Sequence, residues 1–150
     1  MKTSLHIVCE NRFLEEQIVH QLFDAFGSDI ALELLDEFVG MLDNTISRLQ
    51  QARASQDHPG LKYIAHKLTG TAGMYGAMQL AKISALSKTR LRKGAVSSIT
   101  DDCDQLIIMC MKTRLVCVAF LSECRSYCAS AEKVEPKMVA KLLENIQQAA

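Results

Sequence analysis

The residues best suited to chemistry surround one histidine, His66, in a segment whose spacing predicts a helix from Pro59 to about Tyr75. At about 100° per residue, the apolar side chains of this segment share one face, and His66 lies on the opposite, solvent-facing side. The expected core stripe consists of Leu61, Ile64, Leu68, Ala72 and Tyr75. A neutral imidazole is a good nucleophile near pH 7, because its ordinary pKa is about 6.5. The position therefore suits a histidine that reacts in contact with another protein.

Two glycines, Gly70 and Gly73, follow His66 on its own side of the predicted helix. Each costs roughly 1 kcal/mol of helix stability relative to alanine, and core packing does not account for a glycine on a solvent-facing side. Bare backbone beside the imidazole would let another protein approach closely. The alternative is that the helix ends or kinks near Gly73.

Positive charge gathers in the same part of the chain. The protein has 150 residues and no net charge, but residues 58–100 contain seven lysines and arginines and no aspartate or glutamate. The remaining residues hold 10 basic and 17 acidic side chains, a charge of −7. This asymmetry favours an acidic or phosphorylated partner at the middle segment, the alternative being a solvated face neutralised by neighbouring helices. Within it, Lys62 and Lys67 flank His66 and would stabilise a phosphoryl group attached to the ring.

Six cysteines form a second set of chemically suggestive residues, and four of them, from Cys103 to Cys124, recur every seven residues. On one helix seven residues rise about 10.5 Å, too far for a disulfide between successive members. We interpret the repeat as small core hydrophobes on one stripe. Cys124 and Cys128 stand one turn apart, but no companion pair of metal ligands appears at a suitable spacing. A ligand or metal sensor that uses this stripe with Met109 and Met111 is the alternative.

Nearly every segment has helical periodicity, so we expect an all-α fold: an antiparallel four-helix bundle with additional N- and C-terminal helices. Glycines and the turn at residues 57–60 separate the expected helices. We expect helices at about 11–26, 28–54, 59–75, 77–92, 100–129 and 136–148. Residues 1–150 would form one domain, with its core bundle over about 28–129.

The first two helices are expected to bury stripes with the usual 3–4 spacing. The first stripe is Phe13, Leu14, Ile18, Leu22 and Phe26, and the second is Ile30, Leu34, Phe38, Leu42, Ile46 and Leu49. Asn11 could cap the first helix, and Ser28 or Asp29 the second. The one stretch with any strand character is Ser4–Val8.

Several function classes find no support in the sequence. Met1–Arg12 has no apolar run long enough for a signal peptide. The most apolar stretch, Leu106–Leu121, is interrupted by Lys112 and Arg114 and is shorter than the roughly 20 apolar residues of a membrane span. No basic stripe with interleaved aromatics suggests nucleic-acid binding. Without a signal peptide or a membrane span, we expect a soluble cytoplasmic protein. Because neither the HExxH motif nor a nucleophile–base set appears, we do not expect an independent enzyme.

The segment 65–77, AHKLTGTAGMYGA, resembles the signature of bacterial histidine-containing phosphotransfer (HPt) domains. That signature is a histidine, any residue, leucine, lysine, glycine and two small residues, and then Gly-Ala ten and eleven positions after the histidine. It is matched at His66, Leu68, Gly70, Ala72, Gly76 and Ala77. The preceding stretch 34–52 is similar to the long helix that comes before the phosphorylated one. The resemblance covers roughly residues 28–93 well.

Two positions depart from the family pattern. The family usually has lysine three residues after the histidine, where this chain has Thr69. Lys67 or Lys62 could supply the missing charge. Near the end of the next helix the family often has Leu-Glu, and here Ser87-Lys88 makes the surface more basic.

The resemblance implies a phosphorelay intermediate, which accepts a phosphoryl group from a receiver-domain aspartate and passes it to another receiver. The implied partners are receiver domains of response regulators or of hybrid sensor histidine kinases, with no nucleic acid and no membrane. The divalent metal belongs to the receiver, so we expect no cofactor and no metal site in this chain. The implied phosphorylated residue is His66, and the implied phosphate-stabilising or partner-binding residues are Lys62, Lys67, Thr69, Gly70, Gly73 and Lys88.

Two further expectations complete this interpretation. Because the chain has no glycine-rich nucleotide loop, we expect a phosphocarrier without autonomous kinase activity. The alternative is a phosphotransfer-incompetent HPt-like module that binds and regulates receiver or kinase domains, and Thr69 is the feature that favours it.

Overall fold

The computed structural model describes residues 12–94, 99–130 and 133–149, and every regular element within these ranges is helical. The α-helices are α2 (Glu16–Phe26), α3 (Ser28–Ser55), α4 (His58–Thr71), α5 (Met78–Arg92), α6 (Ile99–Ala129) and α7 (Pro136–Ala149). A short 3₁₀ turn, η1 (Ala72–Tyr75), follows α4. The predicted all-α fold class is confirmed. The possible cap Asn11 and the possible strand Ser4–Val8 lie outside the described residues.

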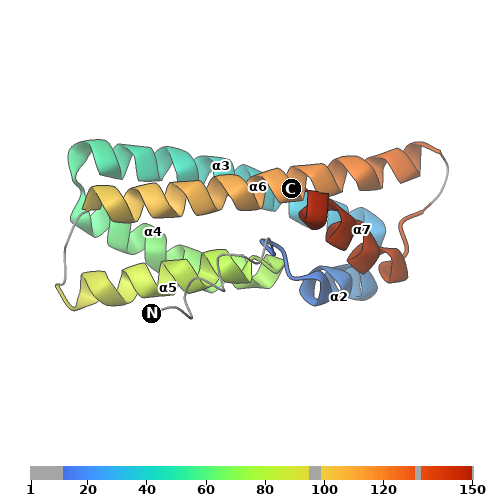
Figure 1. Ribbon diagram of the computed structural model, residues 1–150, viewed down its shortest axis with the longest axis horizontal. Coiled ribbons are helices and arrows are strands. Elements are labelled where there is room, and N and C mark those ends of the chain that lie inside the picture. Colours follow the sequence, from blue (N-terminus) through green and yellow to red (C-terminus); the bar gives the residue numbers. More distant parts are fainter. Residues whose placement is uncertain (1–11, 95–98, 131–132, 150) are drawn as a thin grey trace.

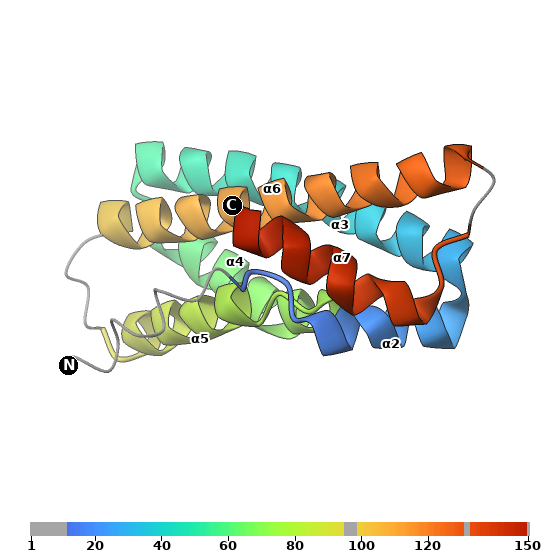
Figure 2. The same cartoon turned by 45° about the vertical axis from the view of Figure 1, so that its right-hand side comes forward.

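Two long helices, α3 and α6, run side by side along the length of the molecule (Figure 1). The α4–α5 hairpin packs against one half of this pair, and α2 packs with α7 against the other half (Figure 1). The turned view in Figure 2 shows α7 lying beside α2 at that second end. The predicted four-helix bundle of α3 to α6 is therefore present over the half that contains α4. The helices at the two ends of the chain extend the bundle beyond it.

Ion pairs between α3 and α6 show that the two helices are antiparallel. From one end to the other they are Asp36–Arg125, Asp43–Arg114 and Arg53–Asp104. All three pairs are substantially exposed, so solvent screens them and they add little to stability. The apolar core beneath them has to supply most of the packing energy.

The seven-residue cysteine repeat of α6 lies in that core, as the spacing predicts. Cys103, Cys110, Cys117 and Cys124 are all fully buried. Burial raises the pKa of the Cys110, Cys117 and Cys124 thiols to about 12. In the same helix, Phe120 meets Phe23 of α2 edge to face, with ring centroids 5.9 Å apart. The stripe thus serves as packing surface for both halves of the molecule.

Helix α6 is, by length and composition, apolar enough to cross a membrane. Its buried stripe nevertheless packs inside the bundle, and its Arg114 pairs with Asp43 of α3. A core helix of a soluble bundle meets the same length and composition criteria. The expectation that the apolar stretch, interrupted by Lys112 and Arg114, is too short for a membrane span is therefore wrong by this criterion.

The start of α2 differs from the prediction, because the helix begins at Glu16 and not near residue 11. The side chain of Gln147 holds the Leu14 backbone: the Leu14 N–H donates to Oε1 at 3.1 Å, and Nε2 donates to the Leu14 carbonyl at 3.0 Å. These two bonds occupy the Leu14 backbone with a partner outside α2. Neither Ser28 nor Asp29 caps α3, since the N-cap is Gly27, with φ +82°.

The predicted stripes of α2 and α3 are partly wrong. In α2 the buried residues are Val19 and Phe23, whereas Phe26 is 53% exposed. In the first turns of α3, Ala31 and Leu35 are buried, and Ile30 is 49% exposed. Apolar residues are adjacent at these points, so a 3–4 repeat can be drawn through either neighbour. Packing between helices decides which one is buried.

Candidate functional site

Helix α4 carries His66 between two well-defined ends. At its start the Asp57 side chain accepts a hydrogen bond from the Gly60 N–H at 2.9 Å, and Pro59 lies in the first turn, where a missing N–H costs little. Beyond its end Gly76 has φ +87°, and a Cβ there would lie 3.1 Å from the Glu15 carbonyl oxygen. Both constraints place His66 in the middle of a helix with a defined rotation.

The rotation of α4 is the one that the sequence predicts. His66 is exposed, whereas Leu61, Ile64, Leu68 and Ala72 are buried in the core. Tyr75, the last residue of the predicted stripe, is half-buried and stacks on Phe38 of α3, with ring centroids 4.4 Å apart. The imidazole therefore faces solvent from the side of α4 opposite the core.

The two glycines beside His66 are not required by internal packing. Among the described residues, and apart from the backbone of its own helix, a Cβ on Gly70 would have no atom within 4 Å, and a Cβ on Gly73 would meet only the Met78 sulfur at 3.7 Å. Gly70 lies within α4, but Gly73 lies in η1, so the α-helix does end before the second glycine. Around Gly70 the structure thus leaves an open surface that a partner could approach.

The predicted cations lie on two helices. Lys62 and Lys67 are exposed on α4, and Lys88 is half-buried on α5. Within the described part of the chain, none of these three ammonium groups pairs with a carboxylate. Their charge is therefore available to an anion brought by another molecule.

Thr69 uses its hydroxyl inside the helix. The hydroxyl donates to the Ala65 carbonyl oxygen at 2.8 Å, a common way for threonine to bond to the preceding turn. In this rotamer it offers no proton to a group on His66. The position where the family usually has lysine thus supplies neither charge nor a free donor.

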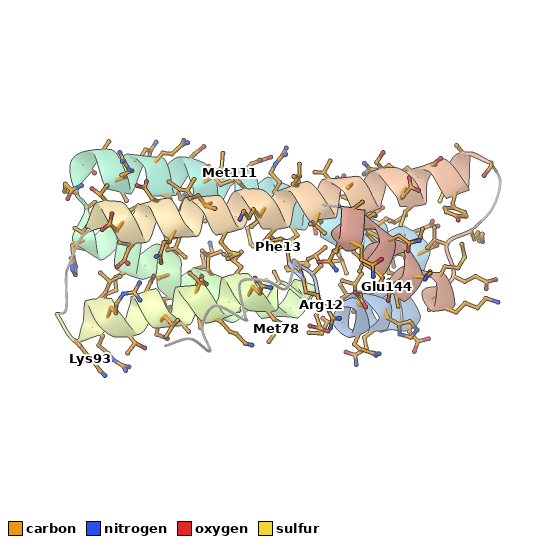
Figure 3. The ribbon with its side chains drawn as sticks, viewed as in Figure 1. Arg12, Phe13, Met78, Lys93, Met111 and Glu144 are labelled. Carbon is orange, nitrogen blue, oxygen red and sulfur yellow. The ribbon has the colours of Figure 1, made fainter. Side chains whose placement is uncertain are left out.

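Large apolar side chains also lie exposed on α4, η1 and α5. They are Tyr63, Met74, Met78 and Leu86, and Figure 3 shows Met78 on α5. None of the four was singled out from the sequence. Large apolar side chains are exposed on other helices too, among them Met111 and Leu115 of α6, so exposure alone does not mark an interaction surface here.

Sequence reasoning also missed Arg48 of α3. A small cleft between α3 and α4, of about 40 Å³, is lined by Arg48 together with Tyr63 and Lys67. Tyr63 lies one helical turn before His66, and Lys67 is its neighbour in sequence. No local pattern marks Arg48, because only the packing of α3 on α4 brings it near this face.

The cysteine stripe offers no comparable site. No group of three or more His, Cys, Asp or Glu residues that could hold a metal ion occurs among the residues the structure describes. Burial also raises the pKa of the Cys110, Cys117 and Cys124 thiols, so they are protonated at neutral pH in the folded protein. The interpretation of the stripe as packing surface agrees with both observations.

With the fold and site established, comparison with known proteins shows the class. Residues 33–115, more than half of the chain, match the Hpt domain family. The chain therefore belongs to the histidine-containing phosphotransfer domain family, which confirms the resemblance seen in the sequence.

Two known proteins are similar to parts of this chain. The phosphorelay protein LuxU of Vibrio harveyi is 35% identical over 69 residues, which are 46% of this chain and 60% of that protein. The match thus spans less than two thirds of this relative. The crystal structure of histidine-containing phosphotransfer protein B (HptB) from Pseudomonas aeruginosa PAO1 superposes with a TM-score of 0.67 at 20% identity. The superposed region covers 75% of this chain and 96% of HptB, which shows that the two proteins share a fold.

Proposed function

We propose that this protein is a phosphorelay intermediate of two-component signalling that carries a phosphoryl group on His66. The observation that carries the proposal is the position of His66: it is exposed in mid-helix, with open backbone at Gly70 and with two cations, Lys62 and Lys67, that pair with no carboxylate of the described residues. Membership of the Hpt family and the similarity to a phosphorelay protein support it.

The proposed step is an in-line displacement on the aspartyl phosphate of a receiver domain. A neutral ring nitrogen of His66 attacks phosphorus, so that an N–P bond forms while the P–O bond to the aspartate breaks. The electron pair of that bond stays on the aspartate carboxylate, and the imidazole releases one proton. Transfer to the next receiver is the reverse reaction on a different aspartate.

The surrounding residues would act through charge and access. Lys62 and Lys67 would stabilise the phosphoryl oxygens or the docked partner, with Lys88 contributing from α5. Gly70, and next to it Gly73, would let the partner's backbone approach the imidazole. The Thr69 hydroxyl is engaged with Ala65, so the charge that the family takes from this position would come from the two lysines.

The proposed partners are receiver domains of response regulators, of hybrid sensor histidine kinases, or of both, in the cytoplasm. In this scheme the receiver brings the divalent metal, and this chain works as a phosphocarrier without kinase activity of its own.

A second candidate function is a phosphotransfer-incompetent module that binds and regulates receiver or kinase domains. The observation that favours it is Thr69, whose neutral hydroxyl faces its own helix at the position where the family usually has lysine. The two candidates share the fold and the docking face. They differ in whether His66 becomes phosphorylated.

Phosphotransfer from purified phosphorylated receivers tests the proposal. We expect at least one receiver to label the wild-type protein, with phosphate that is labile in acid and stable in base, and we expect no labelling of His66→Gln. His20→Gln, which changes a half-buried histidine on α2, is the matched control and should be labelled like the wild type. Equal labelling of His66→Gln would remove His66 from the mechanism. Binding of receivers without any labelling of the wild type would favour the second candidate.

A further inference from the structure

The cleft between α3 and α4 places beside Lys67, which the proposed function already uses, a second cation that it does not use. It is lined by Met41, Asn44, Thr45, Arg48, Tyr63, Ile64, Lys67, Leu68 and Thr71, which include two cations and no carboxylate. A larger, more open hollow of about 440 Å³ adjoins it and shares Arg48, Tyr63 and Ile64. The only carboxylate lining that second hollow belongs to Asp57, which is engaged as the N-cap of α4.

Arg48 differs from most arginines of the described chain in having no acidic partner. Five others pair with carboxylates: Arg12, Arg53, Arg90, Arg114 and Arg125. Arg48 is exposed and lines the cleft, and it forms no ion pair and no side-chain hydrogen bond with any described residue. Its neighbours one turn away on α3 are Asn44, Thr45, Gln51 and Ala52, all of them uncharged.

Arg48 and Lys67 therefore line one cleft from two helices without an anion between them. Two cations that face a shared cavity repel each other, and a carboxylate placed in the cavity would relieve this repulsion and gain two charge-assisted contacts. The arginine fork suits a carboxylate in particular, because two parallel N–H groups can bind its two oxygens. The two cations thus favour binding of a carboxylate from a protein that docks beside α4.

We propose that the α3–α4 cleft is a docking subsite that receives an aspartate or glutamate side chain of the receiver domain, held by Arg48 and Lys67. This inference rests on the proposed function and deepens it, since it assigns part of the partner's recognition to a residue outside the phosphorylated helix. His66 does not line the cleft, so Arg48 acts on docking and not on the reacting phosphorus.

The experiment compares two phosphodonors on the same proteins. One donor is the phosphorylated receiver that labels the wild type, and the other is phosphoramidate, a small donor that needs no docking surface. We expect Arg48→Ala to lower kcat/KM for transfer from the receiver about tenfold, and Arg48→Glu to lower it further. Labelling of both variants by phosphoramidate should equal that of the wild type. The deficit with the receiver should shrink as ionic strength rises, because salt screens exposed charges.

Arg125→Ala is the matched control. It removes the same charge from α6, where Arg125 pairs with Asp36, and it should leave transfer from the receiver unchanged. Arg48 is exposed on a helix and alanine is a strong helix former, so Arg48→Ala should fold like the wild type, which circular dichroism can verify.

Each outcome decides one question. Wild-type rates for Arg48→Ala and Arg48→Glu with the receiver would overturn the docking subsite while leaving the relay function intact. Equal slowing with both donors would also overturn it, because Arg48 would then act on the chemistry at His66. If neither phosphoramidate nor any phosphorylated receiver labels the wild type, the proposed function itself is contradicted.

Discussion

Helices α4 and α6 both bury an apolar stripe, but the nucleophilic side chain of α4 lies on its exposed face and those of the α6 repeat lie on its buried face. His66 of α4 is exposed, whereas the four thiols of the α6 repeat are fully buried. Burial raises the pKa of three of these thiols to about 12, so they remain protonated at physiological pH. The comparison teaches that reactivity depends on the helix face a residue occupies, and not on its type alone.

The charged residues of the two helices differ in the same sense. On α6, Arg114 and Asp104 are engaged in ion pairs with α3. On α4, Lys62 and Lys67 have no carboxylate partner among the described residues, and Arg48 across the cleft from Lys67 has none either. Charges paired within the molecule hold helices together, whereas unpaired charges around an exposed nucleophile are available to a partner.

The largest expected effect concerns the thiols. At pH 8 a thiol with a pKa of about 12 is deprotonated in roughly one molecule in ten thousand, so alkylation of native Cys110, Cys117 and Cys124 should be at least about a thousandfold slower than that of exposed Cys128. Mass spectrometry after timed treatment with iodoacetamide measures these rates, and Cys9→Ser removes the cysteine outside the described residues. Comparable rates without denaturant would break the contrast between α4 and α6.

A smaller effect is expected when the open surface beside His66 is filled. Gly70→Gln should lower the rate of transfer from a phosphorylated receiver by at least about tenfold, because its side chain would occupy the partner's approach. The fold should be retained, since nothing lies within 4 Å of a Cβ at this position and glutamine is the better helix former. Gly40→Gln, at an equally open position on α3, should transfer normally. Normal transfer by Gly70→Gln would show that bare backbone is not needed there.

The most gradual expected effect is on stability at alkaline pH. The buried thiols ionise near pH 9 in the unfolded chain but only near pH 12 in the folded one, so stability is fully present below about pH 9 and is lost as pH rises towards 12. Each such thiol should remove at most about 1.4 kcal/mol per pH unit in this window. Urea unfolding at several pH values should show a shallower loss for Cys110→Ala than for the wild type.

The control for this prediction is Cys128→Ala, which alters an exposed thiol and should follow the wild-type pH dependence. Parallel curves for Cys110→Ala and the wild type would mean that the buried thiol does not contribute to the alkaline loss.

Much of the fold follows from local signals. The start of α4 at Asp57-Pro59 and the seven-residue cysteine stripe lie where the sequence predicts them, whereas α4 ends at Thr71 and a 3₁₀ turn fills the rest of the predicted helix as far as Gly76. The prediction is wrong at the start of α2, because Gln147 holds the Leu14 backbone from the far end of the chain. It is also wrong at Ile30, where the adjacent Ala31 is buried instead, and at Phe26, which is exposed at the end of α2. At the positions where the prediction is wrong, contacts between segments distant in the sequence decide the structure.

The sequence by itself determined that His66 lies on a helix and points away from the core, because helical periodicity and end signals act within a few residues. It also determined the family, through the spacing from the histidine to the Gly-Ala pair. Only the tertiary structure decided that Arg48 shares a cleft with Tyr63 and Lys67, and that α2 and α7 extend the bundle. The physical reason is that which faces of two helices meet depends on how their side chains pack together, and no local pattern in either helix specifies it.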